Sequence, residues 1–175
     1  RAVYAAITSL LISFLLGPRL IKRLQKLKMG QEVREDGPKT HLVKSGVPTM
    51  GGILIILSVI ISVFLWQDID SLYTWLLILA ITGFGFIGFI DDYIKIRNKD
   101  SGGLQARFKL IGQFFLSFII VIILYLGRTE HTTLLYLPFV KTPVLDMSIY
   151  YIPFSVVLLM GYSNAVNFTD GLDGL

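Results

Sequence analysis

The feature that most constrains this chain is a run of apolar residues that stops at two adjacent carboxylates. Residues 72–90 contain no Lys, Arg, Asp, Glu or His over 19 positions, which is about the length of a helix that crosses the hydrocarbon core of a bilayer. Asp91 and Asp92 follow directly. The sequence therefore predicts a membrane-spanning helix that ends on this pair of acids.

Composition places the rest of the chain in the same class. Of its 175 residues, 54% are hydrophobic, and the mean hydropathy is +0.69, values typical of a membrane protein. We expect an all-α, polytopic transmembrane helix bundle that forms a single integral membrane domain and has no nucleic-acid partner. The predicted spans are residues 2–17, 50–66, 72–90, 110–126 and 152–165.

Two connecting segments carry their own predictions. Residues 19–28 alternate apolar and cationic side chains at helical spacing, which suits either a helix along the bilayer surface or a plain solvated helix. Residues 127–151 alternate β-branched, aromatic and proline residues and predict a small hairpin on the membrane surface. The glycines at 83, 85 and 88 match a dinucleotide fingerprint, but no strand precedes them, so we interpret them as sites of close helix packing.

The paired acids are electrostatically unfavourable at a helix C-terminus, where unsatisfied carbonyls already carry negative charge. A divalent cation, a lysine from elsewhere in the chain or both would relieve this cost, whereas the plain alternative is a solvated acidic helix end. The chain has no cysteine, so a metal would need oxygen or imidazole ligands. Its two histidines, His41 and His131, are far apart in sequence.

The distribution of cations predicts the topology. Residues 17–50 hold eight Lys or Arg and residues 91–109 hold five, whereas the segments on the opposite side hold three. The positive-inside rule then puts the N-terminus outside, both basic loops in the cytoplasm and the hairpin in the periplasm. An odd number of spans returns the end of the chain to the cytoplasmic face as well.

A second polar cluster follows the last predicted span. Asn167, Asp170 and Asp173 recur at every third position and would share one face of a continuing helix. With glycines at 171 and 174, a broken helix or loop is equally possible, and caps and turns would use the same residue types. On the predicted topology they converge with Asp91 and Asp92. Oxygen ligands favour Mg²⁺ or Mn²⁺ over zinc, and Lys109, at the start of the fourth span, would complete a phosphate-handling site. For Lys95, Arg97 and Lys99 we favour a topological role.

Four motifs, in matching order over essentially the whole chain, resemble the phospho-N-acetylmuramoyl-pentapeptide transferase family. It is a branch of the polyprenyl-phosphate sugar-1-phosphate transferase superfamily. The paired acids and the Asn-Asp-Asp motif are similar to the superfamily, whereas the stretch from Pro48 to Gly52, preceded by Lys44, resembles the muramoyl branch. The four motifs are Pro48-Thr49-Met50-Gly51-Gly52, Phe89-Ile90-Asp91-Asp92-Tyr93, Gly103-Leu104-Gln105-Ala106-Arg107-Phe108-Lys109 and the run from Asn164 to Leu175.

This resemblance implies a Mg²⁺-dependent transfer of phospho-MurNAc-pentapeptide from UDP-MurNAc-pentapeptide to undecaprenyl phosphate in the bacterial cytoplasmic membrane, which forms lipid I and releases UMP. It also implies a homodimer. By motif match the catalytic residues would be Asp91, Asp92 and Lys109. The substrate-binding residues would be Asn167, Asp170, Asp173, Lys44 and Thr49. The metal ligands would be Asp170, Asp173 and Asp91.

Members of the family have about ten spans and a further acid and His-rich motif in later loops, so we expect this chain to be a fragment that is inactive alone. Three other functions stay open, and one of them is a non-catalytic membrane anchor or scaffold, for which Asp91→Asn and Asp170→Asn would leave function intact. A related transferase would use UDP-GlcNAc or another hexosamine nucleotide. A transporter would normally place an ionisable group near the middle of the membrane, and the five predicted spans lack one.

Overall fold

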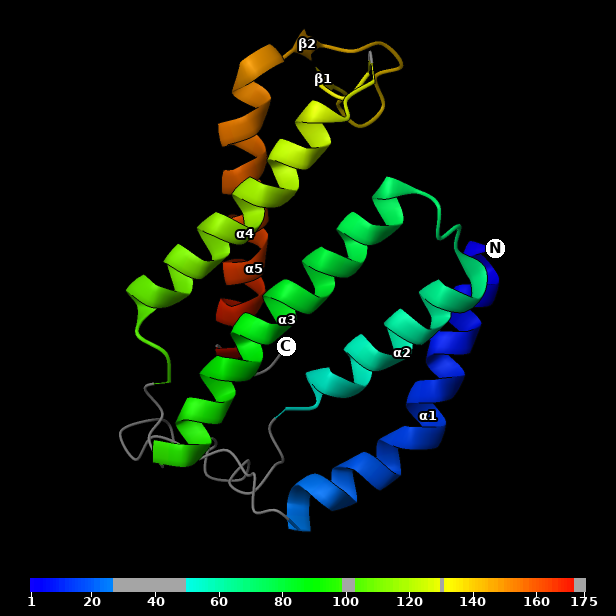
Figure 1. The fold of residues 1–175 in the computed structure, drawn as a ribbon, viewed down its shortest axis with the longest axis vertical. Helices are drawn as coiled ribbons and strands as arrows, with labels where there is room; N and C mark the ends of the chain where they lie inside the picture. The colour runs from blue at the N-terminus through cyan, green and yellow to red at the C-terminus, as the bar shows by residue number, and fades with distance from the viewer. Residues whose placement is uncertain (27–49, 99–102, 130, 172–175) are drawn as a thin grey trace. The chain divides into compact units, whose positions relative to one another are not determined.

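The computed structural model describes residues 1–26, 50–98, 103–129 and 131–171. Within these ranges the chain forms five α-helices and one two-stranded sheet (Figure 1), which confirms the all-α class and the small hairpin. Two compact units, residues 1–109 and 110–175, divide the chain. The helices are α1 (Ala2–Lys26), α2 (Gly52–Trp66), α3 (Leu72–Asn98), α4 (Ala106–Leu126) and α5 (Tyr151–Gly171).

Four of the described helices are long and apolar enough to cross a membrane: α1, α3, α4 and α5. The helix α2 is equally apolar but has 15 residues, a rise of about 22 Å at 1.5 Å per residue, which is shorter than a hydrocarbon core of about 30 Å. Its start is fixed because the preceding Met50 is buried and has a φ of 70°, outside the helical region. The helix therefore begins after Met50, at Gly52.

The predicted end of the third helix is wrong. The helix α3 does not stop at Asp91 and Asp92 but continues to Asn98. A charged residue marks the edge of the apolar core and not the end of a helix, and Asp91 pairs with Lys95 one turn later. Lys95 and Arg97 then lie in the last turn, where cations interact favourably with the helix carbonyls.

The predicted span at 2–17 and the amphipathic segment after it also form one helix, α1, with Pro18 inside it. The axis of α1 bends along its length (Figure 1), as proline inside a helix commonly causes. Polar side chains join α1 to α2: the hydroxyls of Ser9 and Ser13 donate to Ser58 Oγ at 3.3 and 3.1 Å. Hydroxyl contacts of this kind are common between membrane helices.

In the first unit, α2 packs against both α1 and α3. A glycine permits the second contact, because a Cβ at Gly85 would overlap the side chain of Ile56. Gly85 lies inside α3, so the close-packing interpretation of the glycine pattern is confirmed at this position, and the dinucleotide interpretation is excluded by the helix around it.

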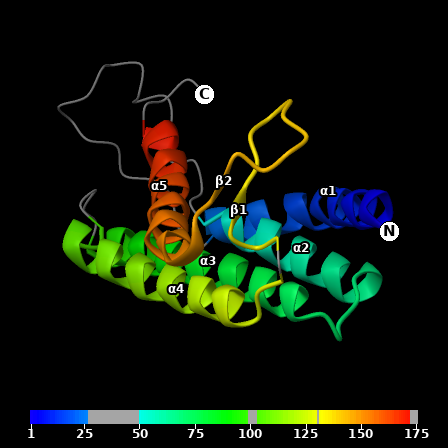
Figure 2. The same cartoon turned by 90° about the horizontal axis from the view of Figure 1, so that it is seen from above.

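The second unit contains the hairpin between α4 and α5 (Figure 2). Its strands are β1 (Leu134–Leu135) and β2 (Leu145–Asp146), antiparallel with Leu134 opposite Asp146. A short 3₁₀ helix, Ser148–Tyr150, leads into α5. Between the helices, buried Gln113 of α4 donates to Ser163 Oγ at 3.2 Å and accepts from Asn164 Nδ2 at 2.7 Å.

Candidate functional site

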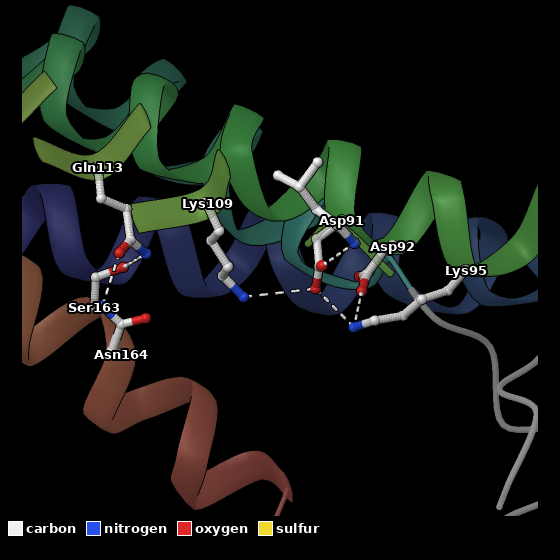
Figure 3. Close-up of polar contacts among 8 residues, drawn as sticks. Asp91, Asp92, Lys95, Lys109, Gln113, Ser163 and Asn164 are labelled. Carbon is white, nitrogen blue, oxygen red and sulfur yellow. Dashed lines mark hydrogen bonds and ion pairs between the residues drawn. The ribbon is translucent and has the colours of Figure 1, made fainter. Parts of the chain in front are cut away.

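The centre of the site is Asp91, a buried carboxylate near the end of α3. Its residue surface is 6% exposed, and protein groups engage both of its oxygens (Figure 3). The backbone N–H of Leu104 donates to Oδ1 at 2.8 Å, and Lys95 Nζ lies 2.7 Å from Oδ2. An ionised carboxylate with a charged partner and a backbone donor is well compensated for its burial.

A second lysine approaches the same oxygen from α4. Lys109 Nζ lies 3.6 Å from Asp91 Oδ2, and its side chain is 16% exposed. Lys109 lies in the first turn of α4. In this turn the N–H groups of Phe108 and Lys109 both donate to the carbonyl oxygen of Gln105. The expectation that a lysine from elsewhere in the chain compensates the acids is confirmed for Asp91.

Asp92 has a different environment from its neighbour. Successive helical residues point about 100° apart, and the Asp92 side chain is 35% exposed, against 8% for Asp91. Its Oδ1 lies 3.4 Å from Lys95 Nζ, so Lys95 contacts both acids. The pair therefore consists of one carboxylate fixed by the protein and one that remains accessible to a ligand.

The loop before α4 reaches Asp91 because of a glycine. Gly103 has a φ of +57°, in the left-handed region that glycine adopts without steric cost. A Cβ there would lie 2.6 Å from Asp91 Oδ1 and 2.7 Å from Lys95 Cε, closer than van der Waals contact allows. The absence of a side chain at Gly103 lets the N–H of Leu104 meet the carboxylate.

The four charged side chains Asp91, Asp92, Lys95 and Lys109 carry no net formal charge together. A phosphate or pyrophosphate bound beside them would add negative charge that these residues do not balance. Oxygen donors suit a hard divalent cation, but a metal at Asp91 would have to replace a present partner. Among the described residues, no group of three or more His, Asp or Glu side chains is arranged to hold a metal.

The second predicted cluster lies in the other unit. Asn167 is exposed on α5, one turn beyond Asn164, and Asp170 lies near the end of the same helix. Of the two courses that the sequence left open, helix or loop, the structure shows a helix through Asn167 and Asp170. Their predicted convergence with Asp91 and Asp92 stays a prediction.

Several predicted residues fall outside what the structure describes. They are Lys44, Thr49, Asp173 and the side chain of Asp170. Their predicted roles in substrate and metal binding remain predictions from the resemblance.

Two residues of the site were not identified from the sequence. Lys95 was assigned to topology, although an acid followed by a lysine four residues later is a known helix pairing and could have indicated the contact. Gly103 gave no local signal, because its role depends on the approach of Asp91 from another element. A glycine with positive φ occurs in many kinds of turn, so the residue type alone does not indicate this contact.

Comparisons with known proteins show which family the chain belongs to. A model of glycosyl transferase family 4 matches residues 74–175, which is more than half of the chain. Residues 44–56 match signature 1 of phospho-N-acetylmuramoyl-pentapeptide-transferase. This signature includes Met50 and the first turn of α2.

Curated relatives carry the name phospho-N-acetylmuramoyl-pentapeptide-transferase. The protein of Borreliella afzelii is 49% identical over 176 residues, which cover 100% of this chain and 50% of the relative. The proteins of Thermodesulfovibrio yellowstonii and Syntrophus aciditrophicus are 46% and 45% identical, again over 100% of this chain and 49% and 48% of the relatives. The chain thus spans about half the length of the curated relatives it matches.

The family match includes all of α3 beyond its first turn and the whole of α4, and therefore the paired acids and both lysines described above. With four helices of membrane-spanning length and composition, the chain is a multi-pass membrane protein. It belongs to glycosyl transferase family 4 and carries the signature of the phospho-N-acetylmuramoyl-pentapeptide-transferases.

Proposed function

We propose that the full-length protein transfers phospho-MurNAc-pentapeptide from UDP-MurNAc-pentapeptide to undecaprenyl phosphate, with formation of lipid I and release of UMP. The observation that supports this most directly is the cluster around Asp91: two lysines share a buried carboxylate beside a more exposed one. The names of the relatives and the match to the signature support the choice of the sugar substrate.

The location of the cluster suits a lipid acceptor. Asp91 and Asp92 immediately follow the uncharged stretch of α3, so they lie where the apolar core of the bilayer would end. A polyprenyl phosphate keeps its chain in the membrane and its phosphate at this boundary. We therefore place the reaction at the surface of the bacterial cytoplasmic membrane, on the inner face that the positive-inside rule assigns to the basic loops.

The reaction is a phosphoryl transfer. An oxygen of undecaprenyl phosphate attacks the sugar-linked phosphorus of UDP-MurNAc-pentapeptide, and the P–O bond to UMP breaks. UMP leaves with the electron pair of that bond, and the new P–O bond completes the pyrophosphate of lipid I. Because a phosphate monoester is already largely dianionic at neutral pH, the acids serve the attack mainly by orientation.

The two acids and Lys109 then have separate roles. Asp92, the more exposed carboxylate, orients the lipid phosphate. Lys109 Nζ, 3.6 Å from Asp91, is only loosely engaged and donates to phosphoryl oxygens as charge develops on them. Asp91 holds the cations, lysine or metal, that balance the negative charge of the substrates. Asn167 and Asp170 would contact the nucleotide on the part of α5 that faces the cytoplasm.

We propose Mg²⁺ as the cofactor. The site's charged side chains sum to zero, so the incoming phosphates require further positive charge, and the chain offers oxygen ligands without thiolates. Asp170 and Asp173 would hold the ion, with Asp91 as the third predicted ligand if it exchanges a lysine for the metal. When bound, Mg²⁺ would neutralise pyrophosphate oxygens and help UMP to leave.

The test is UMP release by the full-length protein in lipid or detergent, with undecaprenyl phosphate as acceptor. We expect release with UDP-MurNAc-pentapeptide and Mg²⁺, loss of release with EDTA, and recovery when Mg²⁺ is restored. UDP-GlcNAc serves as the alternative donor. Preferential turnover of UDP-GlcNAc would reject the muramoyl assignment, and turnover of neither would reject the transferase.

A matched pair of variants tests the site. Asp92→Asn should reduce the rate by about 10²-fold or more, the range for loss of a group that orients or accepts in the transition state. Asp70→Asn, an exposed acid in the turn before α3, should not. Crosslinking in native membranes would test the homodimer that the resemblance implies.

A further inference from the structure

Asp91 is held by groups that the proposed chemistry does not use. The N–H of Leu104 donates to one oxygen, and Lys95 Nζ contacts the other. Both partners lie close to Gly103, whose hypothetical Cβ would touch Asp91 Oδ1 and Lys95 Cε at once. These contacts place one glycine, one lysine and one backbone amide around a single buried carboxylate. Figure 3 shows the lysine beside Asp91.

We propose that Lys95 and Gly103 are positioning residues for Asp91: together they fix the orientation of its carboxylate, and so the direction from which Lys109 and the substrate phosphates meet it. This inference deepens the proposed function and rests on it. Neither residue is required to touch substrate, so their effects should act through Asp91.

The argument for Gly103 is steric. A carboxylate can turn about its Cα–Cβ and Cβ–Cγ bonds, and the Leu104 N–H at 2.8 Å removes this freedom at Oδ1. Any side chain at Gly103 would have to displace Asp91 Oδ1 or Lys95 Cε, since the added Cβ would lie 2.6 and 2.7 Å from them. The positive φ of Gly103 adds backbone strain for other residues.

The argument for Lys95 is its geometry with the two acids. Its Nζ lies 2.7 Å from Asp91 Oδ2 and 3.4 Å from Asp92 Oδ1. The contact to Asp92 is the longer one and is partly solvated, so the effect of Lys95 falls mainly on Asp91. Lys109 is less tightly engaged, at 3.6 Å from the same Asp91 oxygen, so the proposed substrate contact and the positioning contact fall on different lysines.

The consequence for catalysis is a loss of rate without an equal loss of binding. A displacement of about 1 Å in a reacting group can reduce a rate by about 10²-fold. In the full-length protein, Gly103→Ala and Lys95→Gln should each lower kcat by about 10–100-fold and change KM for UDP-MurNAc-pentapeptide by less than about twofold. Lys95→Arg, which keeps the charge, should recover at least part of the lost kcat.

The control for Gly103→Ala is Gly88→Ala in the same structural unit. It adds the same methyl group to α3, one turn before Asp91, where no atom lies within 4 Å of the new Cβ. We expect Gly88→Ala to retain the wild-type kcat. Loss of activity in both glycine variants, with full activity in Lys95→Gln, would contradict the inference.

A double-variant test separates positioning from independent chemistry. If Lys95 and Gly103 act through Asp91, then Lys95→Gln and Gly103→Ala should not reduce the residual rate of Asp91→Asn any further. Additive losses would overturn the proposal. Where Gly103→Ala does not yield folded protein, Lys95→Gln with and without Asp91→Asn gives the same decision.

Hydrogen exchange provides a readout that needs no turnover. Asp91→Asn replaces a charged acceptor of the Leu104 N–H with a neutral one, so the exchange rate of that amide should rise about tenfold or more, whereas Asp70→Asn should leave it unchanged. Unchanged exchange at Leu104 would reject the positioning contact. A protein without UMP release but with this exchange response would reject the proposed function and retain the contact.

Discussion

Lys95 Nζ lies 2.7 Å from Oδ2 of Asp91, one helical turn away on α3. The lysine is 37% exposed at its side chain while the acid is 8% exposed, so the pair joins a solvated cation to a buried anion. Removing the anion is then more disruptive than removing an exposed charge, because it leaves Lys95 and Lys109 together without their shared partner. This asymmetry distinguishes Asp91 from Asp92.

Asp91→Asn should reduce the free energy of unfolding by about 1.5–3 kcal/mol, the range for a hydrogen bond to a charged group. Asp92→Asn should change it by less than about 0.5 kcal/mol, because its contact is long and partly solvated. Thermal unfolding of the full-length protein in one detergent measures both. Equal losses would show that the buried contacts of Asp91 do not contribute to stability.

Lys109→Gln should lower kcat/KM for UMP release by about 10²–10³-fold, as expected for loss of a donor to developing negative charge. Lys109→Arg should retain more activity than Lys109→Gln. Lys22→Gln, an exposed cation on α1, is the matched control and should behave as wild type. Equal activity of Lys109→Gln and the control would remove Lys109 from the proposed mechanism.

Gly85→Val should destabilise the packing of α2 on α3 by about 1–3 kcal/mol, because the new side chain overlaps Ile56. Gly88→Val makes the same change in helix propensity as Gly85→Val, but no atom lies within 4 Å of its new Cβ. It therefore serves as the control in thermal unfolding. Ile56→Ala should partly rescue Gly85→Val. Equal destabilisation in the two glycine variants without rescue would contradict the close contact.

Gln113→Leu should cost about 0.6 kcal/mol and at most about 1.7 kcal/mol, the average and the maximum measured for side-chain hydrogen bonds between membrane helices. The variant removes the contacts to Ser163 and Asn164. Ser117→Ala, one turn further along α4, should be neutral or slightly stabilising, because within the described part of the chain the buried Ser117 hydroxyl has no hydrogen-bond partner. A loss of stability in Ser117→Ala together with no loss in Gln113→Leu, measured by thermal unfolding, would contradict these two expectations.

Asp146 predicts a pH effect in the hairpin. The Thr133 side chain and the N–H of Ser148 lower the pKa of its carboxyl below the ordinary value of 3.8. The stabilisation is therefore present above the unfolded pKa and is lost as pH falls through the folded one. Exchange of the Ser148 amide, corrected for intrinsic rates, should become less protected below about pH 4, and Asp146→Asn should abolish this dependence.

The sequence was sufficient for the broad architecture. Uncharged runs predicted all five described helices, and alternating β-branched residues predicted the hairpin that pairs Leu134 with Asp146. The same reasoning placed the end of α3 too early. It treated the charge of Asp91 as a helix terminus, whereas the backbone continues helically to Asn98 and charge only limits the apolar core.

The site was predictable in part. The electrostatic cost of adjacent acids correctly indicated a lysine partner for Asp91, and Lys109 is one. Lys95, four residues after Asp91, was recognisable from helical spacing but was assigned to topology. Gly103 could not be identified, because the need for a missing Cβ arises from contact between segments that local sequence does not place together.

The bond from the Leu104 N–H to Asp91 Oδ1 also links occupancy of the acid to the conformation of the chain entering α4. A ligand that competes for this oxygen must weaken the attachment of that segment. By thermodynamic reciprocity, a molecule that holds the segment away from α3 must favour the competing ligand by the same factor. An inhibitor bound at the start of α4 would thus alter affinity at the carboxylate without touching it.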